Sequence, residues 1–231
     1  LSSKTAMFSD ILTGYILPKF DMSNANEYLE IMSKINGKDK RIYAMPILES
    51  APIANKTTRM HELSQLSNLL LEEKEMILNV RVGGNDFCNL YGLRRSITQT
   101  IYDIGVVRDI FTDIINVFAQ NFILSAPVWE YFGTDDTDKW AQGLKAELSL
   151  DKVNGFIGKT AVHPSQIPLI NNNLRVSAED YNDALTILNW DNNSFGVSKS
   201  EGISRMNEVK CHEHWAYRIK TLGDIYGIKE S

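Results

Sequence analysis

The sequence predicts an α/β protein built on a parallel sheet, on the basis of two observations. Short apolar runs alternate with longer segments whose apolar residues recur at helical spacing, and this alternation persists from about residue 14 to residue 159. The apolar runs are nearly continuous, as is typical of parallel strands that helices cover. With 231 residues, 43% of them hydrophobic, the chain can bury one substantial core or two small ones.

Five strand–helix units follow from this pattern. We expect strands at 14–19, 42–50, 76–84, 122–128 and 155–159. We expect the intervening helices at 24–37, 57–74, 98–120 and 138–148. Successive units of this kind imply a parallel sheet covered by helices.

The C-terminal part differs in kind. A helix should begin after Ser177, an N-cap residue with Asp180 three positions on, and run to about residue 190. A polar stretch follows at 191–205, and then a helix from about residue 207 to 226. We therefore expect strand–helix units over 1–175 and a C-terminal helical extension over 176–231.

Composition excludes several classes of function. The formal net charge is −5 and no Lys/Arg-rich run occurs, which argues against nucleic acid as a partner. No apolar run approaches the ~20 residues of a membrane span. Cys88 and Cys211 lie far apart without metal-site spacing, as expected of reduced thiols in a cytosolic protein. We expect a soluble, cytoplasmic protein.

The tripeptide Gly158-Lys159-Thr160 matches the end of a nucleotide-binding P-loop, but the rest of that motif is missing. The motif requires a glycine where this chain has Val153. Pro164 also prevents a helix from following Thr160 directly. The stretch is therefore predicted to be the exit of a strand.

Residues that follow parallel strands gather at one rim of the sheet, so polar groups there are candidates for chemistry. The rim residues expected here are Lys19, Glu49, Arg81 at a strand end, Asp86, Glu130, Lys159 and His163. Carboxylates from adjacent strands, Glu49 and Asp86, suit Mg²⁺.

Structural alternatives exist for each of these side chains. Glu49 also suits a helix cap, and Asp86 an Asx turn. Lys19 would neutralise a substrate anion or be solvated, and His163 would act as an acid–base group or be structural.

The segments "ILPK", "PILES", "VGGNDF" and "NGFIGKTAVHPSQI" occur in this order. Together they resemble the HpcH/HpaI aldolase and citrate lyase beta-subunit family over about residues 14–226. The likeness is greatest to its branch of TIM-barrel C–C bond lyases, whose relatives occur in bacterial stress and tellurite-resistance gene neighbourhoods. The resemblance implies a (β/α)8 barrel in which Glu49 and Asp86 hold Mg²⁺ and an enolate forms as a C–C bond is broken or made.

The resemblance also implies roles for individual residues. The catalytic residues would be Lys19, Glu208 and His163, and the substrate-binding residues would be Arg81, Lys159 and Gln166. Glu208 stands where relatives have an aspartate, on a segment that can reach a neighbouring subunit's site. We therefore expect a homo-oligomer, a trimer or a hexamer.

One departure concerns the N-terminal part of the barrel. Only 16 residues precede Leu17, so the first two or three βα units do not show, including the strand that supplies a substrate-binding arginine in relatives. We expect either a part of a longer protein, which we favour, or a relative whose barrel does not close.

The function expected on this basis is a Mg²⁺-dependent lyase for a carboxylate or acyl-CoA substrate. Two alternatives stay open: a non-catalytic barrel subunit of a stress-response or biosynthetic complex, and a pyruvate-type class II aldolase that uses no thioester.

Overall fold

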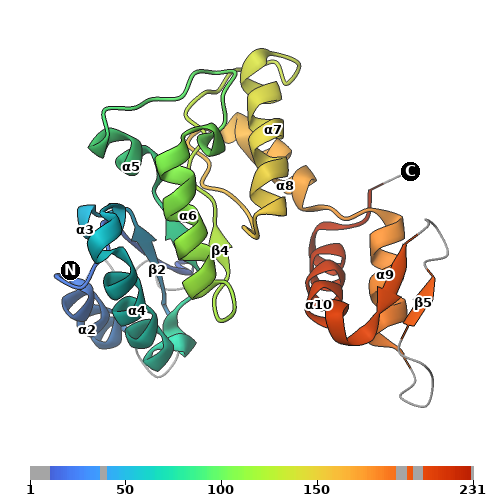
Figure 1. Ribbon diagram of the computed structural model, residues 1–231, viewed down its shortest axis with the longest axis horizontal. Helices are drawn as coiled ribbons and strands as arrows, with labels where there is room; N and C mark the ends of the chain where they lie inside the picture. Colours follow the sequence, from blue (N-terminus) through green and yellow to red (C-terminus); the bar gives the residue numbers. More distant parts are fainter. Residues whose placement is uncertain (1–10, 37–40, 191–196, 200–204, 230–231) are drawn as a thin grey trace. The chain divides into compact units, whose positions relative to one another are not determined.

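The computed structural model describes residues 11–36, 41–190, 197–199 and 205–229. The chain divides into two compact units, residues 1–166 and 167–231, whereas the sequence placed a division at residue 175 (Figure 1). Each unit is described by itself.

The first unit contains a parallel sheet, which confirms the predicted fold class. Its strands are β1 (Gly14–Leu17), β2 (Tyr43–Leu48), β3 (Val80–Val82) and β4 (Leu124–Ser125), in the order β1-β2-β3-β4. All three pairings are parallel. The order follows the sequence, as in a barrel of successive βα units.

The predicted fifth strand is reduced to a single parallel bridge between Ala126 and Lys159. Around it, the Ile157 amide donates to the Leu124 carbonyl at 2.7 Å, and the Ala126 amide donates to the Gly158 carbonyl at 3.1 Å. The segment therefore continues the sheet beyond β4. No helix follows Thr160 before Pro164, as the proline predicted.

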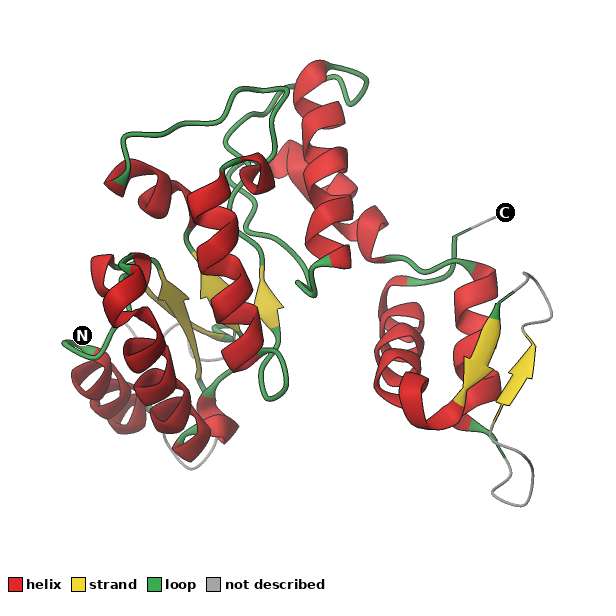
Figure 2. Cartoon of the chain, viewed as in Figure 1, coloured by secondary structure: helices red, strands yellow, loops and turns green. Residues whose placement is uncertain are grey.

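Helices connect the strands (Figure 2). They are α2 (Ala25–Ile35), α3 (Ala51–Ala54), α4 (Lys56–Glu72), α5 (Gly84–Leu90), α6 (Gly105–Phe118) and α7 (Lys139–Val153), with 3-10 turns at Lys74–Met76, Ile101–Asp103 and Pro164–Gln166.

Two boundaries differ from the prediction. Helix α6 begins at Gly105 rather than near residue 98, because Thr100 and Asp103 form a capping box that closes a separate 3-10 turn. The predicted strand 76–84 is reduced to β3 (Val80–Val82), because a 3-10 turn extends to Met76 and α5 begins at Gly84.

Helix α6 shows how the core of this unit forms. Its buried side chains are Val107, Ile110, Phe111, Ile114 and Phe118, a stripe at helical spacing. Each such fully buried side chain contributes roughly 1.5–3 kcal/mol of transfer free energy. Helix α4 lies beside α6 (Figure 1) and adds further buried leucines to the same core.

An ion-pair cluster also joins α4 to α6. The Arg59 side chain, 3% exposed, donates from Nη1 to Asp109 at 2.8 Å and to Asp113 at 2.7 Å. Its remaining nitrogens donate to the carbonyls of Ile53 and Ala54. The buried guanidinium is thus satisfied by two carboxylates and two carbonyls.

The second unit is mainly helical. It contains α8 (Ile167–Leu174), α9 (Ala178–Leu188), β5 (Val197–Lys199), β6 (Met206–Glu208) and α10 (Val209–Tyr226). The Ser177 hydroxyl accepts from the Asp180 amide at 3.1 Å, which confirms the predicted N-cap. The antiparallel β5–β6 pair was not predicted, because its first strand lies within a stretch too polar to show a strand pattern.

Helices α9 and α10 pack closely. A Cβ on Gly223 of α10 would lie 2.4 Å from the Tyr181 ring of α9, so only glycine allows this approach. Among the described residues, no helix is both long enough and apolar enough to cross a membrane.

Candidate functional site

Two carboxylates meet at the carboxyl ends of β2 and β3. Glu49 directly follows β2, and Asp86 lies in the first turn of α5, four residues after β3 ends. Strands β2 and β3 are hydrogen-bonded neighbours, so both residues come to the same rim. Asp86 lies in a helix and not in the Asx turn that was its structural alternative.

Gly83 makes room for Glu49. A Cβ at this position would lie 2.2 Å from Oε2 of Glu49 and 2.4 Å from its Cβ. The glycine has φ −100°, which any residue adopts, so space rather than backbone conformation requires it. The "VGG" segment therefore lets the β3 backbone lie directly against the Glu49 side chain.

Lys19 connects the two carboxylates. Its backbone amide donates to Oε1 of Glu49 at 2.9 Å, and its ammonium donates to Oδ1 of Asp86 at 2.6 Å. The residue has φ 50°, a left-handed conformation that costs a non-glycine residue of order 1–3 kcal/mol. This turn after β1 is what points the amide and the ammonium at the same carboxylate pair.

The electrostatics of the pair favour a cation. Burial raises the pKa of Glu49, and the Asp86 carboxylate raises it further, while the Lys19 amide lowers it. The hydrogen bond that the Lys19 ammonium donates to the Asp86 carboxylate raises the pKa of Lys19. Two carboxylates this close oppose each other's ionisation unless positive charge lies between them.

The donor set fits Mg²⁺. Mg²⁺ is usually held by one or two carboxylates, with water and substrate oxygens completing an octahedron. Within the described ranges, no three His, Cys, Asp or Glu side chains form a group that could hold a metal, so an all-protein cage for Ca²⁺ or Zn²⁺ is not found there. Glu49 and Asp86 would be the protein ligands.

Arg81 lies near this pair, on β3. It is a half-buried residue whose guanidinium donates to the Thr160 hydroxyl. Burial lowers its pKa, and the negative charge of Glu49 raises it. Thr160 thus orients the guanidinium, and the expected role of Arg81 in substrate binding stays a prediction.

Lys159 does not line the rim as the sequence predicted. Its side chain is fully buried, with the ammonium 2.9 Å from Oε1 of Glu147 and 2.8 Å from Oδ2 of Asp151. Both carboxylates belong to α7, and Asp151 also accepts from the Tyr102 hydroxyl at 2.7 Å. The lysine is turned toward α7 because two buried carboxylates need a counter-charge.

His163 and Gln166 organise their own loop. The His163 ring stacks on Phe132 at 4.5 Å between centroids, and its Nδ1 lies 2.9 Å from the Ser165 hydroxyl. The Gln166 amide donates to the carbonyls of Trp129 and Tyr131, both at 2.9 Å.

The side-chain oxygen of Gln166 accepts a hydrogen bond from the Val162 amide at 2.9 Å. Gln166 is fully buried, so the structure uses its polar atoms internally. A substrate contact by this side chain would have to displace these bonds.

Glu208 lies in the second unit, at the start of α10. Its amide donates to Nδ1 of His212 at 3.0 Å. The hydrogen bond that the exposed Cys211 thiol donates to the Glu208 carboxylate, together with the negative charge of that carboxylate, raises the pKa of the thiol. These contacts fix the residue locally, and its expected role toward another subunit stays a prediction.

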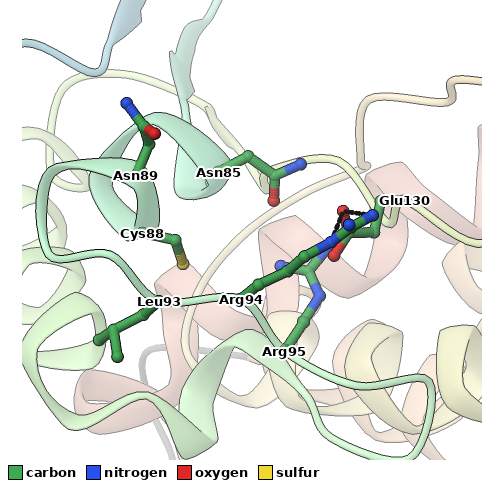
Figure 3. Close-up of a pocket in the computed structure, with 7 residues that line it drawn as sticks. All are labelled: Asn85, Cys88, Asn89, Leu93, Arg94, Arg95 and Glu130. Atoms are coloured by element: carbon green, nitrogen blue, oxygen red, sulfur yellow. Dashed lines mark hydrogen bonds and ion pairs between the residues drawn. The ribbon is translucent and has the colours of Figure 1, made fainter.

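Sequence reasoning missed a pocket beside Asp86. It is lined by Asn85, Cys88, Asn89, Leu93, Arg94, Arg95 and Glu130 (Figure 3). Glu130 was expected at the rim, and it pairs with Arg94 at 3.2 Å. The sequence does show two successive arginines, Arg94 and Arg95. They follow no predicted strand and fit no apolar periodicity, so nothing indicated that they line a pocket.

The comparisons with known proteins agree with this fold. The family model described as "C-C_Bond_Lyase of the TIM-Barrel fold" matches residues 1–228. Among curated proteins, none matches the chain.

Solved structures match at low identity. CitE from Mycobacterium tuberculosis, in complex with magnesium, acetoacetate and coenzyme A, is 16% identical with a TM-score of 0.59, over 96% of this chain and 73% of its own. A citrate lyase from Burkholderia xenovorans LB400 is 13% identical with a TM-score of 0.66, over 95% and 66%. RipC from Yersinia pestis is 18% identical with a TM-score of 0.52, over 72% and 65%. The chain thus spans less than two thirds of the last two proteins, and identities this low establish the fold alone.

Proposed function

The chain belongs to the family of C–C bond lyases of the TIM-barrel fold, and on this premise we propose that it is a Mg²⁺-dependent lyase that cleaves or forms a carbon–carbon bond in a carboxylate or acyl-CoA substrate. The observation that carries the proposal is the convergence of Glu49 and Asp86 at one rim, with Lys19 between them. The magnesium, acetoacetate and coenzyme A bound to CitE are consistent with it.

Glu49 and Asp86 would hold the ion. When bound, Mg²⁺ supplies positive charge that stabilises the enolate formed as the carbon–carbon bond breaks. The Asp86 carboxylate now accepts from the Lys19 ammonium, so this ammonium must move when a metal ion takes its place. The Lys19 side chain is 67% exposed and therefore free to swing toward an incoming substrate carboxylate.

Arg81 would orient the substrate. Its guanidinium is half-buried near Glu49 and is held by Thr160, so a carboxylate bound there has a fixed direction. Two-point attachment through Arg81 and the metal would hold the bond to be broken in one orientation.

The group that transfers a proton is proposed from the family resemblance. We propose Glu208 of a neighbouring subunit as the group that protonates the product enolate, with His163 as the alternative. This assignment requires a homo-oligomer, a trimer or a hexamer, and we propose a cytoplasmic location for it. Sedimentation velocity of the protein measures the oligomeric state directly.

Calorimetric titration with Mg²⁺ tests the metal site. Binding should occur in the wild type and be lost in Glu49→Ala and in Asp86→Asn. Glu75→Ala is the matched control, because Glu75 is also a carboxylate paired with a cation, Arg41, but lies outside the site. Equal Mg²⁺ binding by the wild type and Glu49→Ala would refute the metal assignment.

Activity assays separate the classes of function. Oxaloacetate, malyl-CoA and citramalyl-CoA should be offered with and without Mg²⁺. Cleavage of a thioester supports the proposal, and cleavage of free acids alone supports the aldolase alternative. Intact Mg²⁺ binding without cleavage of any of them supports a non-catalytic barrel subunit or an unrelated substrate.

A further inference from the structure

A pocket of about 280 Å³ is lined in part by α5, the helix that carries Asp86 (Figure 3). Its lining comes from α5, from the segment that follows α5, and from Glu130 after β4. Asn85, which lines it, precedes Asp86 directly in the chain. The volume is just below the usual range for ligand sites, so it suits one compact group rather than a whole nucleotide.

Arg95 is a buried cation with unused donors at this pocket. Its side chain is 1% exposed and its guanidinium lies over the Trp129 ring, 5.2 Å from the centroid. Nη2 donates to the Val128 carbonyl. Within the described part of the chain, Nε and Nη1 donate no hydrogen bond. Unmade bonds of a buried charged donor are costly, so an acceptor that reaches Arg95 would be held strongly.

Glu147, the carboxylate that pairs with Arg95, also contacts other donors. Oε2 of Glu147 is 3.5 Å from Arg95 Nε, and the same carboxylate is 2.9 Å from the Lys159 ammonium. Oε2 also accepts from the Ile101 amide at 2.7 Å. Glu147 thus serves the Lys159 ammonium and the Ile101 amide and accepts no hydrogen bond from Arg95 Nε, so the Arg95 guanidinium keeps donors without an acceptor in the ranges that the structure describes.

The other lining residues add one further cation and its partner. Arg94, 78% exposed, pairs with Glu130 at 3.2 Å, and Asn85 projects toward this pair (Figure 3). The lining thus carries two guanidinium groups and one carboxylate. Glu130 opposes an anion at its own end of the pocket, so an anion would lie toward Arg95.

We propose that this pocket binds a carboxylate or phosphate group, through Arg95, with Arg94 and the Asn85 amide as further donors. Because Asn85 and Asp86 are successive residues, a group bound here would be the far anionic end of the substrate held at Glu49 and Asp86. This last step rests on the proposed function, whereas anion binding by the pocket does not.

The two cysteines of the chain provide a direct test. Cys88 lines the pocket, and the exposed Cys211 belongs to the second unit and serves as an internal reference. Mass spectrometry would follow the labelling of both thiols by methyl methanethiosulfonate, without metal and at constant ionic strength set with chloride. The two probes are inorganic phosphate and malonate, and whichever protects better identifies the preferred group.

The expected result is slower labelling of Cys88, with Cys211 unchanged. Arg94→Gln should require about tenfold more of the anion for equal protection, the effect of losing one charged hydrogen bond. Arg41→Gln is the matched control, because Arg41 is also an exposed arginine paired with a glutamate. Arg95→Lys should abolish protection, and if this variant does not fold, Arg94→Gln still decides.

The proposal is overturned if neither anion slows Cys88 relative to Cys211, or if Arg94→Gln protects as well as the wild type. Glu49→Gln separates the two proposals, because it should lose Mg²⁺ binding and keep the protection of Cys88. Loss of metal binding by itself would therefore leave the anion site standing.

Discussion

The ammonium of Lys19 lies 2.6 Å from Oδ1 of Asp86, so this carboxylate has a cation of the chain itself as its partner. The Lys19 amide holds the second carboxylate of the pair, Glu49, at 2.9 Å. If Glu49 and Asp86 hold Mg²⁺ as proposed, the Lys19 side chain would compete with the ion while the Lys19 backbone orients one of its ligands.

Replacing Lys19 by methionine should therefore strengthen Mg²⁺ binding. An exposed ion pair is worth about 0.2–1 kcal/mol, so the dissociation constant should fall up to about fivefold. Calorimetry measures it, and Lys34→Met, which removes an exposed lysine paired with Glu30, is the control. Unchanged or weaker binding in Lys19→Met would contradict competition by the ammonium.

Gly83→Ala should weaken Mg²⁺ binding at least about tenfold, because the new Cβ must displace the Glu49 carboxylate. Its φ accepts alanine, but the new Cβ would also lie 2.4 Å from the Cβ of Glu49, so the backbone must shift and the folding of the variant is checked by circular dichroism. Gly105→Ala is the control, because nothing lies within 4 Å of a Cβ placed there. Equal affinity in both variants would mean that Glu49 does not hold the ion.

Lys159→Met should destabilise the fold by about 3–5 kcal/mol, because it removes the counter-charge of the buried Asp151 and leaves Glu147 with Arg95 alone, at 3.5 Å. Urea unfolding measures the loss. Lys145→Met is the control, since Lys145 lies on α7, the helix that carries both carboxylates, and its exposed ammonium bonds the Asp136 carbonyl and no other group among the described residues. An unchanged free energy of unfolding in Lys159→Met would contradict this expectation and would suit a lysine at the rim that only binds substrate.

Acid should weaken the contact between α4 and α6. The hydrogen bond from Arg59 holds the pKa of Asp109 below its ordinary value of 3.8. The folded state therefore binds this proton less readily than the unfolded state, and the stabilisation, present above pH 3.8, is lost as pH falls through the lower folded pKa.

Urea midpoints measured from neutral pH down to pH values below 3.8 check this expectation. The midpoint should fall less in Asp109→Asn than in the wild type. Glu72→Gln, which changes an exposed carboxylate of α4, should follow the wild type. Equal slopes for Asp109→Asn and the wild type would show that the Arg59 contact does not contribute.

Much of the fold could be predicted from the sequence, because apolar runs and helical spacing reflect burial directly. The four strands of the first unit and the Ser177 cap were predicted, and the structure has them. The division of the segment before Gly105 into a 3-10 turn and a helix was not predicted. There, hydrogen bonds between Thr100 and Asp103 decide the boundary, and periodicity does not reveal them.

The candidate site, too, could be predicted only in part. Glu49 and Asp86 could be expected together, because adjacent parallel strands deliver their following residues to one rim. Lys159 was placed wrongly because its position after a strand says nothing about its partners. The signal lay in α7, where Glu147 and Asp151 fall on the same stripe as the buried Trp140, Leu144 and Leu148. Carboxylates on a buried stripe require a buried cation.

Gln166 bears on how this protein can be re-engineered. Its carboxamide ties the backbone of Trp129 and Tyr131 to that of Val162. The two loops are therefore a single module. A chimera that grafts either loop from a relative onto this scaffold would break the tie unless the other loop came with it, whereas exchanging both together would preserve it.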